Sequence, residues 1–241
     1  MEALDDMKTI ALWGDSIGKG IIYSEERGRY CLAKNRCTNL LKQAGLEIDS
    51  WARMGATITE GFQQYMETEA RPGSIAVIEY GGNDCDPNWD DVNDDPDSFH
   101  DGKTPLPLFR DTLAQFITEA RIRWQEPVAV IPPPLEAERY YRWVCQGRDP
   151  ERILRYLVDV HHIYRWQERY AWAVREVAQA LNCPLLDLRT PFLDARDYPS
   201  LLCLDGIHPN EAGHQLMAQT IIHELIKRDL IPETGIKEEV A

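Results

Sequence analysis

The tripeptide Gly14-Asp15-Ser16 lies near the N-terminus, directly after a short apolar run at residues 9–13. A serine in this position would project its hydroxyl from the carboxyl edge of a sheet, where it could act as a nucleophile. Taken alone, the tripeptide is more typical of a turn in which Ser16 caps a helix. The chemical interpretation therefore depends on which other side chains reach the same edge.

Asp205 and His208 are three residues apart in the segment Asp205-Gly206-Ile207-His208, close to the other end of the chain. A carboxylate at this spacing can accept the Nδ1 proton of the histidine, which leaves Nε2 free to take a proton from a serine. The alternative is an ordinary helix start, in which Asn210 is the cap and His208 is exposed.

Two further clusters follow predicted strands. Asn83, in Gly81-Gly82-Asn83-Asp84, could donate its side-chain amide to the oxyanion of an ester-cleavage intermediate. Gly55 could add a backbone N–H to the same oxyanion hole. The alternatives are a frequent Gly-Gly-Asn-Asp turn and a simple loop glycine.

Two other motifs overlap Ser16. Residues 14–18 fit the G-x-S-x-G nucleophile elbow, but in α/β-hydrolases several strands precede that elbow, whereas here only one does. Residues 14–20 approach a phosphate-binding loop, but the spacing is one residue short and Gly20 replaces the hydroxyl that binds magnesium. Both interpretations are disfavoured.

Apolar periodicity predicts the elements that position these clusters. Short apolar runs predict strands, and longer runs at helical spacing predict helices. The predicted strands are residues 9–13, 46–51, 74–80, 128–131 and 184–188, and the predicted helices are 31–44, 58–70, 108–124, 163–181 and 211–228. This alternation predicts a doubly wound, mainly parallel sheet covered on both faces by helices. Ligands of such sheets bind beyond the carboxyl ends of the strands.

We expect one domain over residues 1–241, with lid insertions at about 84–104 and 135–160. The first insertion contains eight aspartates and fails the EF-hand template, so we interpret it as a solvated lid, with a calcium site as the alternative. These aspartates are Asp84, Asp86, Asp90, Asp91, Asp94, Asp95, Asp97 and Asp101. We expect no metal, since His161 and His162 are adjacent and point to different faces of a helix.

Charge and composition exclude several partner classes. The formal net charge of −14 disfavours nucleic acid, because the summed field repels polyanions. No apolar run approaches the roughly 20 residues of a membrane span, and the chain begins with acidic residues, so we expect a cytoplasmic protein. The six cysteines show no CxxC spacing and are expected to be free thiols. The sequence leaves the oligomeric state open.

In this order along the chain, the four clusters resemble the blocks of the SGNH hydrolase superfamily, also called GDSL-type esterases and lipases. The resemblance spans about residues 9–226 and implies a three-layer, flavodoxin-like fold. It further implies that Ser16 is the nucleophile, that Asp205 and His208 complete the triad, and that Ser16, Gly55 and Asn83 form the oxyanion hole. Ile17 stands where the family usually has leucine, and the second block lacks its usual asparagine.

The resemblance implies an esterase that works through an acyl-enzyme and needs no cofactor. Its substrate would be a small-molecule ester, and we favour short acyl groups on carbohydrates, because aromatic side chains in the insertions suit stacking on sugars. These side chains are Trp89, Phe99, Tyr140, Tyr141 and Trp143. The alternatives are a lipase, lysophospholipase or thioesterase of the same family, and a binding module without catalysis on the same fold.

Overall fold

A central sheet of five parallel strands organises the part of the chain that the computed structural model describes, residues 9–231. Residues 1–8, which include the acidic residues used for the cytoplasmic expectation, lie outside the described part, and that expectation stays a prediction. The strand order is β4-β1-β5-β6-β7. The strands are β1 (Ile10–Gly14), β4 (Ile48–Ser50), β5 (Ile75–Glu79), β6 (Glu126–Ile131) and β7 (Leu185–Asp187). This order is the flavodoxin-like one and confirms the predicted fold class.

Strands β1 and β5, which precede Ser16 and Asn83, lie side by side within the sheet. All five residues of β1 and all five of β5 are buried, as expected for parallel strands covered on both faces. Leu12 pairs with Val77 and Gly14 with Glu79. The chain goes from β1 to β4 on one side and then to β5 on the other, so the strand order reverses between β1 and β5. A crevice at such a reversal is the usual ligand site of an open α/β sheet.

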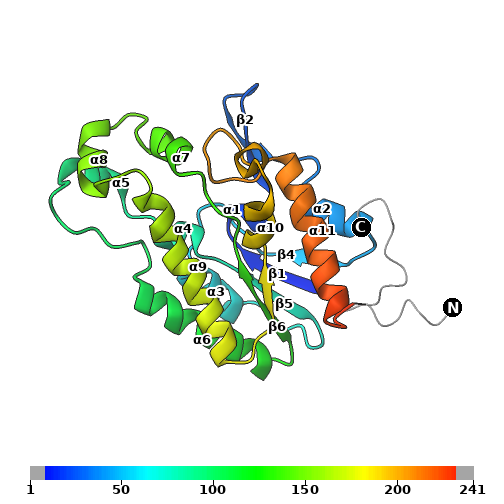
Figure 1. The fold of residues 1–241 in the computed structure, drawn as a ribbon. Helices are drawn as coiled ribbons and strands as arrows, with labels where there is room; N and C mark the ends of the chain where they lie inside the picture. The colour runs from blue at the N-terminus through cyan, green and yellow to red at the C-terminus, as the bar shows by residue number, and fades with distance from the viewer. Residues whose placement is uncertain (1–8, 232–241) are drawn as a thin grey trace.

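Helices cover both faces of the sheet, as Figure 1 shows. One core packs around Phe192 and Met217, on the face covered by α2 (Cys37–Gln43), α10 (Arg189–Asp194) and α11 (Glu211–Lys227). The other core packs around Phe116 and Tyr170, beneath α3 (Ile58–Glu67), α6 (Leu106–Ile122) and α9 (His162–Ala180). The sheet and its two helical layers form the expected three-layer sandwich.

The two predicted insertions contain short helices that lie together beyond the carboxyl edge of the sheet (Figure 1). The first contains α4 (Gly82–Cys85) and α5 (Trp89–Asp94), and the second contains α7 (Ala137–Val144) and α8 (Pro150–Leu157). A third apolar cluster, which includes Val92, Tyr140 and Ile153, packs the insertions against each other and against the start of α9. The insertions therefore form one packed unit over the edge where the polar clusters lie.

The structure differs from the sequence prediction near residue 31. The predicted helix 31–44 begins only at Cys37, and the preceding residues form an antiparallel hairpin of β2 (Ile21–Ser24) and β3 (Arg29–Leu32). The hairpin is only four residues long on each side, too short for a clear pattern, and its Tyr23–Tyr30 pair also packs on Trp143 of the second insertion. Short elements α1 (Ser16–Lys19) and η1 (Tyr198–Leu201) were not predicted either.

Replacing Gly61 by alanine is expected to destabilise the fold. Alanine usually favours a helix over glycine by about 1 kcal/mol, but a methyl group at Gly61 would overlap the hydroxyl and ring of buried Tyr80. We expect a net loss of about 1–3 kcal/mol in the free energy of unfolding, measured in urea. The exposed Gln63→Ala substitution in the same helix is the control and should change stability by less than about 0.5 kcal/mol. A Gly61→Ala protein as stable as wild type would contradict this packing.

Candidate active site

Ser16 is the first residue of α1, two positions after β1 ends. The cap of this helix is Asp15, whose carboxylate accepts the Ile17 N–H at 2.8 Å. The alternative in which Ser16 is the cap is therefore wrong. Ser16 is a buried residue, and its hydroxyl oxygen lies 2.9 Å from Nε2 of His208.

Asp205 holds the ring of His208 in place. One of its carboxylate oxygens lies 2.6 Å from Nδ1 of His208, and the other accepts the backbone N–H groups of Ile207 and His208, both at 3.1 Å. Burial raises the pKa of Asp205, but the hydrogen bond and charge of His208 outweigh it and leave the pKa below its ordinary value. An ionised carboxylate favours the tautomer with the proton on Nδ1, so Nε2 faces Ser16 as a proton acceptor.

The same turn also starts the last helix. Asn210 caps α11, because its side-chain oxygen accepts the Gly213 N–H at 3.1 Å. The cap expected in the alternative interpretation is thus present, but the exposed histidine is not, since His208 is only 3% exposed. One turn both starts α11 and carries the Asp205–His208 pair.

Asn83 lies in α4, just after β5 and next to the Ser16 turn. Its amide nitrogen donates to the Asp15 carboxylate at 3.1 Å and to the Ala56 carbonyl at 3.2 Å. Gly55 precedes Ala56 in the exposed turn after β4 and has a φ of +79°, which favours glycine. Asn83 therefore connects the turns that follow β1 and β4, while Gly55 is absent from the described residues that line the cavity beside Ser16.

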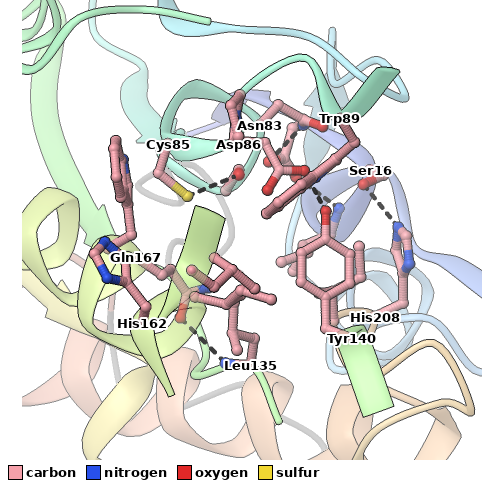
Figure 2. A pocket seen from close by; sticks show the side chains of 18 of the residues that line it. Ser16, Asn83, Cys85, Asp86, Trp89, Leu135, Tyr140, His162, Gln167 and His208 are labelled. Carbon is pink, nitrogen blue, oxygen red and sulfur yellow. Dashed lines mark hydrogen bonds between the residues drawn. The ribbon is translucent and has the colours of Figure 1, made fainter. Parts of the chain in front are cut away.

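A cavity of about 50 Å³ lies beside Ser16 and His208. Figure 2 shows these two residues at one end and His162 at the other, with Asp86 and Tyr140 between them. Asp86 comes from the first insertion, whereas Tyr140 comes from the second and His162 begins α9 just after it. The insertions thus supply most of the wall that faces the hydrogen-bonded Ser16 and His208.

Only two of the five aromatic side chains expected to stack on a substrate line this cavity, namely Trp89 and Tyr140. Trp143 packs edge-on against Tyr23, with ring centroids 4.6 Å apart. Phe99 is 78% exposed, and Tyr141 donates its hydroxyl to the carbonyl of Pro150. The sequence did not single out Tyr156 and Trp166, which also line the cavity.

Glu79, the last residue of β5, lies buried beneath the Ser16 turn and was missed by sequence reasoning. One oxygen of its carboxyl accepts the backbone N–H groups of Asp15 and Gly18, both at 3.2 Å. A Cβ atom at Gly14 would lie 2.7 Å from this oxygen, and one at Gly18 would lie 3.0 Å from it. The two glycines around Ser16 are therefore explained by the close approach of Glu79.

Burial and proximity change the acidity of this pair of carboxyl groups. Burial raises the pKa of Asp15 to about 6, and burial together with the charge of Asp15 raises the pKa of Glu79 well above its ordinary value of 4.5. We therefore infer that Glu79 keeps its proton while Asp15 ionises first. A neutral Glu79 avoids a second negative charge beside the Asp15 carboxylate.

The expectation that the aspartate-rich insertion is simply solvated is wrong for two of its members. Asp84 is fully buried and accepts the backbone N–H groups of Ile58 at 2.9 Å and Gly81 at 3.0 Å, so it joins α3 to the end of β5. Asp86 faces the cavity and accepts the Tyr140 hydroxyl (Figure 2). Composition suggested solvation, but both side chains find donors on elements distant in sequence.

Tyr30 of β3 packs against the histidine from outside the cavity. Its ring centroid lies 5.1 Å from that of His208, with the planes inclined by 58°. Burial and the nearby Asp205 carboxylate raise the pKa of Tyr30 above its ordinary value, so its hydroxyl stays protonated. The unpredicted β2–β3 hairpin therefore covers the outer side of the Asp205–His208 pair.

The fold and the order of the polar clusters along the chain define the class of SGNH hydrolases. Residues 12–216 match the model of the GDSL-like lipase/acylhydrolase family, and the chain therefore belongs to this family. The family assignment confirms the resemblance stated from the sequence. No curated protein matches the chain.

Solved structures with the same fold include several hydrolases. A lipase/acylhydrolase from Enterococcus faecalis is 20% identical, with a TM-score of 0.61 over 92% of this chain and 97% of that one. An acetyl xylan esterase from Geobacillus stearothermophilus is 17% identical, with a TM-score of 0.61 over 90% of this chain and 94% of that one. A GDSL-like lipase from Bacteroides thetaiotaomicron is 14% identical, with a TM-score of 0.59 over 92% and 89%. At these identities the likeness concerns the fold.

The helices of the described chain, residues 9–231, do not reach the combined length and apolarity of a membrane span.

Substitutions of Glu79 should separate its hydrogen bonds from its charge. Glu79→Gln keeps an acceptor for the Asp15 and Gly18 N–H groups and mimics the protonated acid. Glu79→Ala leaves both buried donors without that acceptor, so we expect a loss of about 2–5 kcal/mol in the free energy of unfolding. Glu79→Gln should stay within about 1 kcal/mol of wild type at pH 5, measured in urea.

The pH dependence provides the control for this prediction. Because folding raises the pKa of Glu79, its contribution to stability is lost as pH rises above the ordinary value of 4.5. Glu79→Gln lacks this loss, so its stability relative to wild type should increase from pH 5 to pH 8. Glu69→Gln, at an exposed position, should show no such trend. A pH-independent difference between Glu79→Gln and wild type would contradict a protonated Glu79.

Proposed function

We propose that this chain is a serine esterase in which Ser16 is the nucleophile, His208 the general base and Asp205 the carboxylate that orients it. The observation that carries the proposal is the continuous hydrogen-bonded series from Ser16 through His208 to Asp205, beside a cavity. The same three types of side chain in this relation activate serine in unrelated hydrolases. Membership of the lipase/acylhydrolase family supports the same reaction class.

The reaction would proceed in two acyl-transfer steps. The Ser16 oxygen attacks the ester carbonyl while His208 takes the hydroxyl proton at Nε2, and the resulting imidazolium is stabilised by Asp205. His208 then gives the proton to the leaving alcohol as the ester C–O bond breaks, which leaves an acyl-enzyme. Water, deprotonated by His208, attacks the acyl-enzyme and releases the acid and free Ser16. Neither a metal nor an organic cofactor takes part.

The oxyanion of the tetrahedral intermediate would bind between Ser16, Gly55 and Asn83. The Ser16 N–H lies in the first turn of α1, where a helix offers it no carbonyl. The Asn83 amide borders the cavity and donates to Asp15 and Ala56, so one of these two bonds is exchanged for a bond to the oxyanion. The bond to Ala56 also couples Asn83 to the turn that contains Gly55. The Ser16 N–H needs no such exchange and can stabilise the transition state without reorganisation.

Short acyl esters of carbohydrates are the substrates we favour. A cavity of about 50 Å³ has room for only a few small groups, which suits an acetyl group and part of a small alcohol better than a long acyl chain. Trp89 and Tyr140 give the cavity an aromatic lining, which suits packing against a sugar. Among proteins of the same fold, the Geobacillus stearothermophilus protein is an acetyl xylan esterase.

Ser16→Ala should abolish hydrolysis of p-nitrophenyl acetate, with a loss of kcat on the order of 10⁴-fold or more, because the nucleophilic oxygen is gone. A fluorophosphonate should label the wild-type protein on the peptide that contains Ser16, as fluoride leaves phosphorus and the Ser16 oxygen takes its place. Mass spectrometry of the digested protein measures the labelling.

Ser98→Ala is the matched control, since Ser98 is an exposed serine in the first insertion that bonds to Asp95. This variant should keep both the activity and the label. Full activity of Ser16→Ala would refute the assignment of the nucleophile, and a wild-type protein that is neither labelled nor active would favour a binding module.

A series of p-nitrophenyl esters should separate the short-chain esterase from the lipase and thioesterase alternatives. We expect kcat/KM for the acetate to exceed that for the octanoate by about tenfold or more, because the extra methylenes have no room in the described cavity. If a buried acyl channel existed, each added CH₂ would instead favour binding by about 0.8 kcal/mol. A steady rise of kcat/KM toward the octanoate would contradict the short-chain proposal.

A further inference from the structure

Most polar groups that line the cavity already have partners within the protein. Tyr156 donates its hydroxyl to the His100 carbonyl at 2.6 Å, and the Cys85 thiol donates to the Gly82 carbonyl at 3.2 Å. The Gln167 side chain bonds the backbone of Leu135 at 3.1 Å and of Pro133 at 3.3 Å. These groups shape the wall, and their hydrogen-bonding capacity is used in doing so.

Asp86 differs from these groups. One oxygen of its carboxylate accepts the Tyr140 hydroxyl, and the Trp89 indole N–H lies close to the carboxylate without making a hydrogen bond of good geometry. Burial raises the pKa of Asp86 to about 6, although Tyr140, Lys103 and Trp89 favour the charged form. At pH 8 the carboxylate is therefore ionised, and it has lone pairs left to accept a hydrogen bond from a group in the cavity.

Two donors complement this acceptor. The indole N–H groups of Trp89 and Trp166 are buried, and neither finds a hydrogen-bond acceptor of good geometry in the described part of the chain. Both side chains line the same cavity as Asp86 (Figure 2 labels Trp89 beside it). A buried donor without a partner lowers stability, so a ligand that accepts from it gains affinity.

One acceptor with unused lone pairs and two indole donors without a well-aligned acceptor discriminate between ligand classes. An ammonium group could donate to Asp86 but could not accept from the indoles, and an anion would meet the carboxylates of Asp15 and Asp86. A purely apolar chain would hydrogen-bond to none of the three groups. A hydroxyl group both donates and accepts, and neighbouring hydroxyls on one carbon chain can satisfy all three.

We propose that Asp86 is the specificity-determining residue of the site and accepts a hydrogen bond from a hydroxyl group on the alcohol part of the ester. Trp89 and Trp166 donate to oxygens of the same polyol. The preferred substrates are then short acyl esters of neutral polyhydroxylated alcohols. This inference rests on the proposed esterase function and adds the group that selects the alcohol.

The test compares two acetyl esters of three-carbon alcohols at pH 8. Glycerol 1-acetate carries two hydroxyls, propyl acetate carries none, and release of acetate measures kcat/KM for each. Acetylcholine is a third ester that brings positive charge without a donor. Wild type should prefer glycerol 1-acetate to propyl acetate by about tenfold or more, because a site that binds a hydroxyl rejects the analogue without it.

Two substitutions remove the acceptor in different ways. Asp86→Ala deletes it, and Asp86→Asn keeps its shape, since Tyr140 can donate to the amide oxygen while the NH₂ group replaces the other carboxylate oxygen with a donor. Either should lower kcat/KM for glycerol 1-acetate about tenfold or more and change that for propyl acetate less than about threefold. Asp91→Asn removes the same charge at an exposed position of α5 and should leave the preference intact.

Several results would overturn the inference. An equal loss on glycerol 1-acetate and propyl acetate would show that Asp86 only supports the fold, and a wild-type preference for acetylcholine would show recognition of charge. If wild type hydrolyses p-nitrophenyl acetate but shows no preference for glycerol 1-acetate over propyl acetate, the role of Asp86 is refuted while the proposed esterase function stands. If no ester is hydrolysed and fluorophosphonate does not label Ser16, the proposed function fails and the inference with it.

Discussion

The buried carboxyl group of Glu79 holds the turn on which the candidate active site depends. It lies at the end of β5 and accepts two N–H groups of the turn after β1, so it joins the two central strands beyond the last residues that pair in the sheet. The glycines on either side of Ser16 leave room for this contact. Because α1 starts in this turn, the direction of the Ser16 hydroxyl toward His208 follows from the position of Glu79.

The sheet and the positions of the polar clusters were predictable because they rest on strong local patterns. β1 and β5 are short, wholly apolar segments apart from their last residues, and such segments are typical of buried parallel strands. Parallel strands end at one edge, so the residues that follow them must meet there. Asp205 and His208 were recognisable because their spacing suits a turn, and the structure adds the contact with Ser16 across 192 residues.

The parts of the fold and of the candidate site that the sequence did not predict depend on contacts between residues distant in the chain. The β2–β3 hairpin is held by Trp143 and covers His208 through Tyr30, and neither contact leaves a periodic pattern. Aspartate content predicted a solvated insertion, but Asp84 is buried because Ile58 and Gly81 supply its hydrogen bonds. A carboxylate is rarely buried without such partners, and partners distant in sequence are invisible to composition.

Buried carboxyl groups beside the nucleophile reduce stability, which points to a role in function. Folding raises the pKa of Asp15 and of Asp84 from 3.8 to about 6, so each contributes stability at low pH that is lost as the pH rises above 3.8. Both use their oxygens to fix backbone N–H groups at the edge of the sheet, and Asp15 also orients Asn83. An apolar core would be more stable but would supply no acceptors there. The two apolar cores lie on the faces of the sheet, away from this edge, and their burial supplies the stability that offsets the buried carboxyl groups.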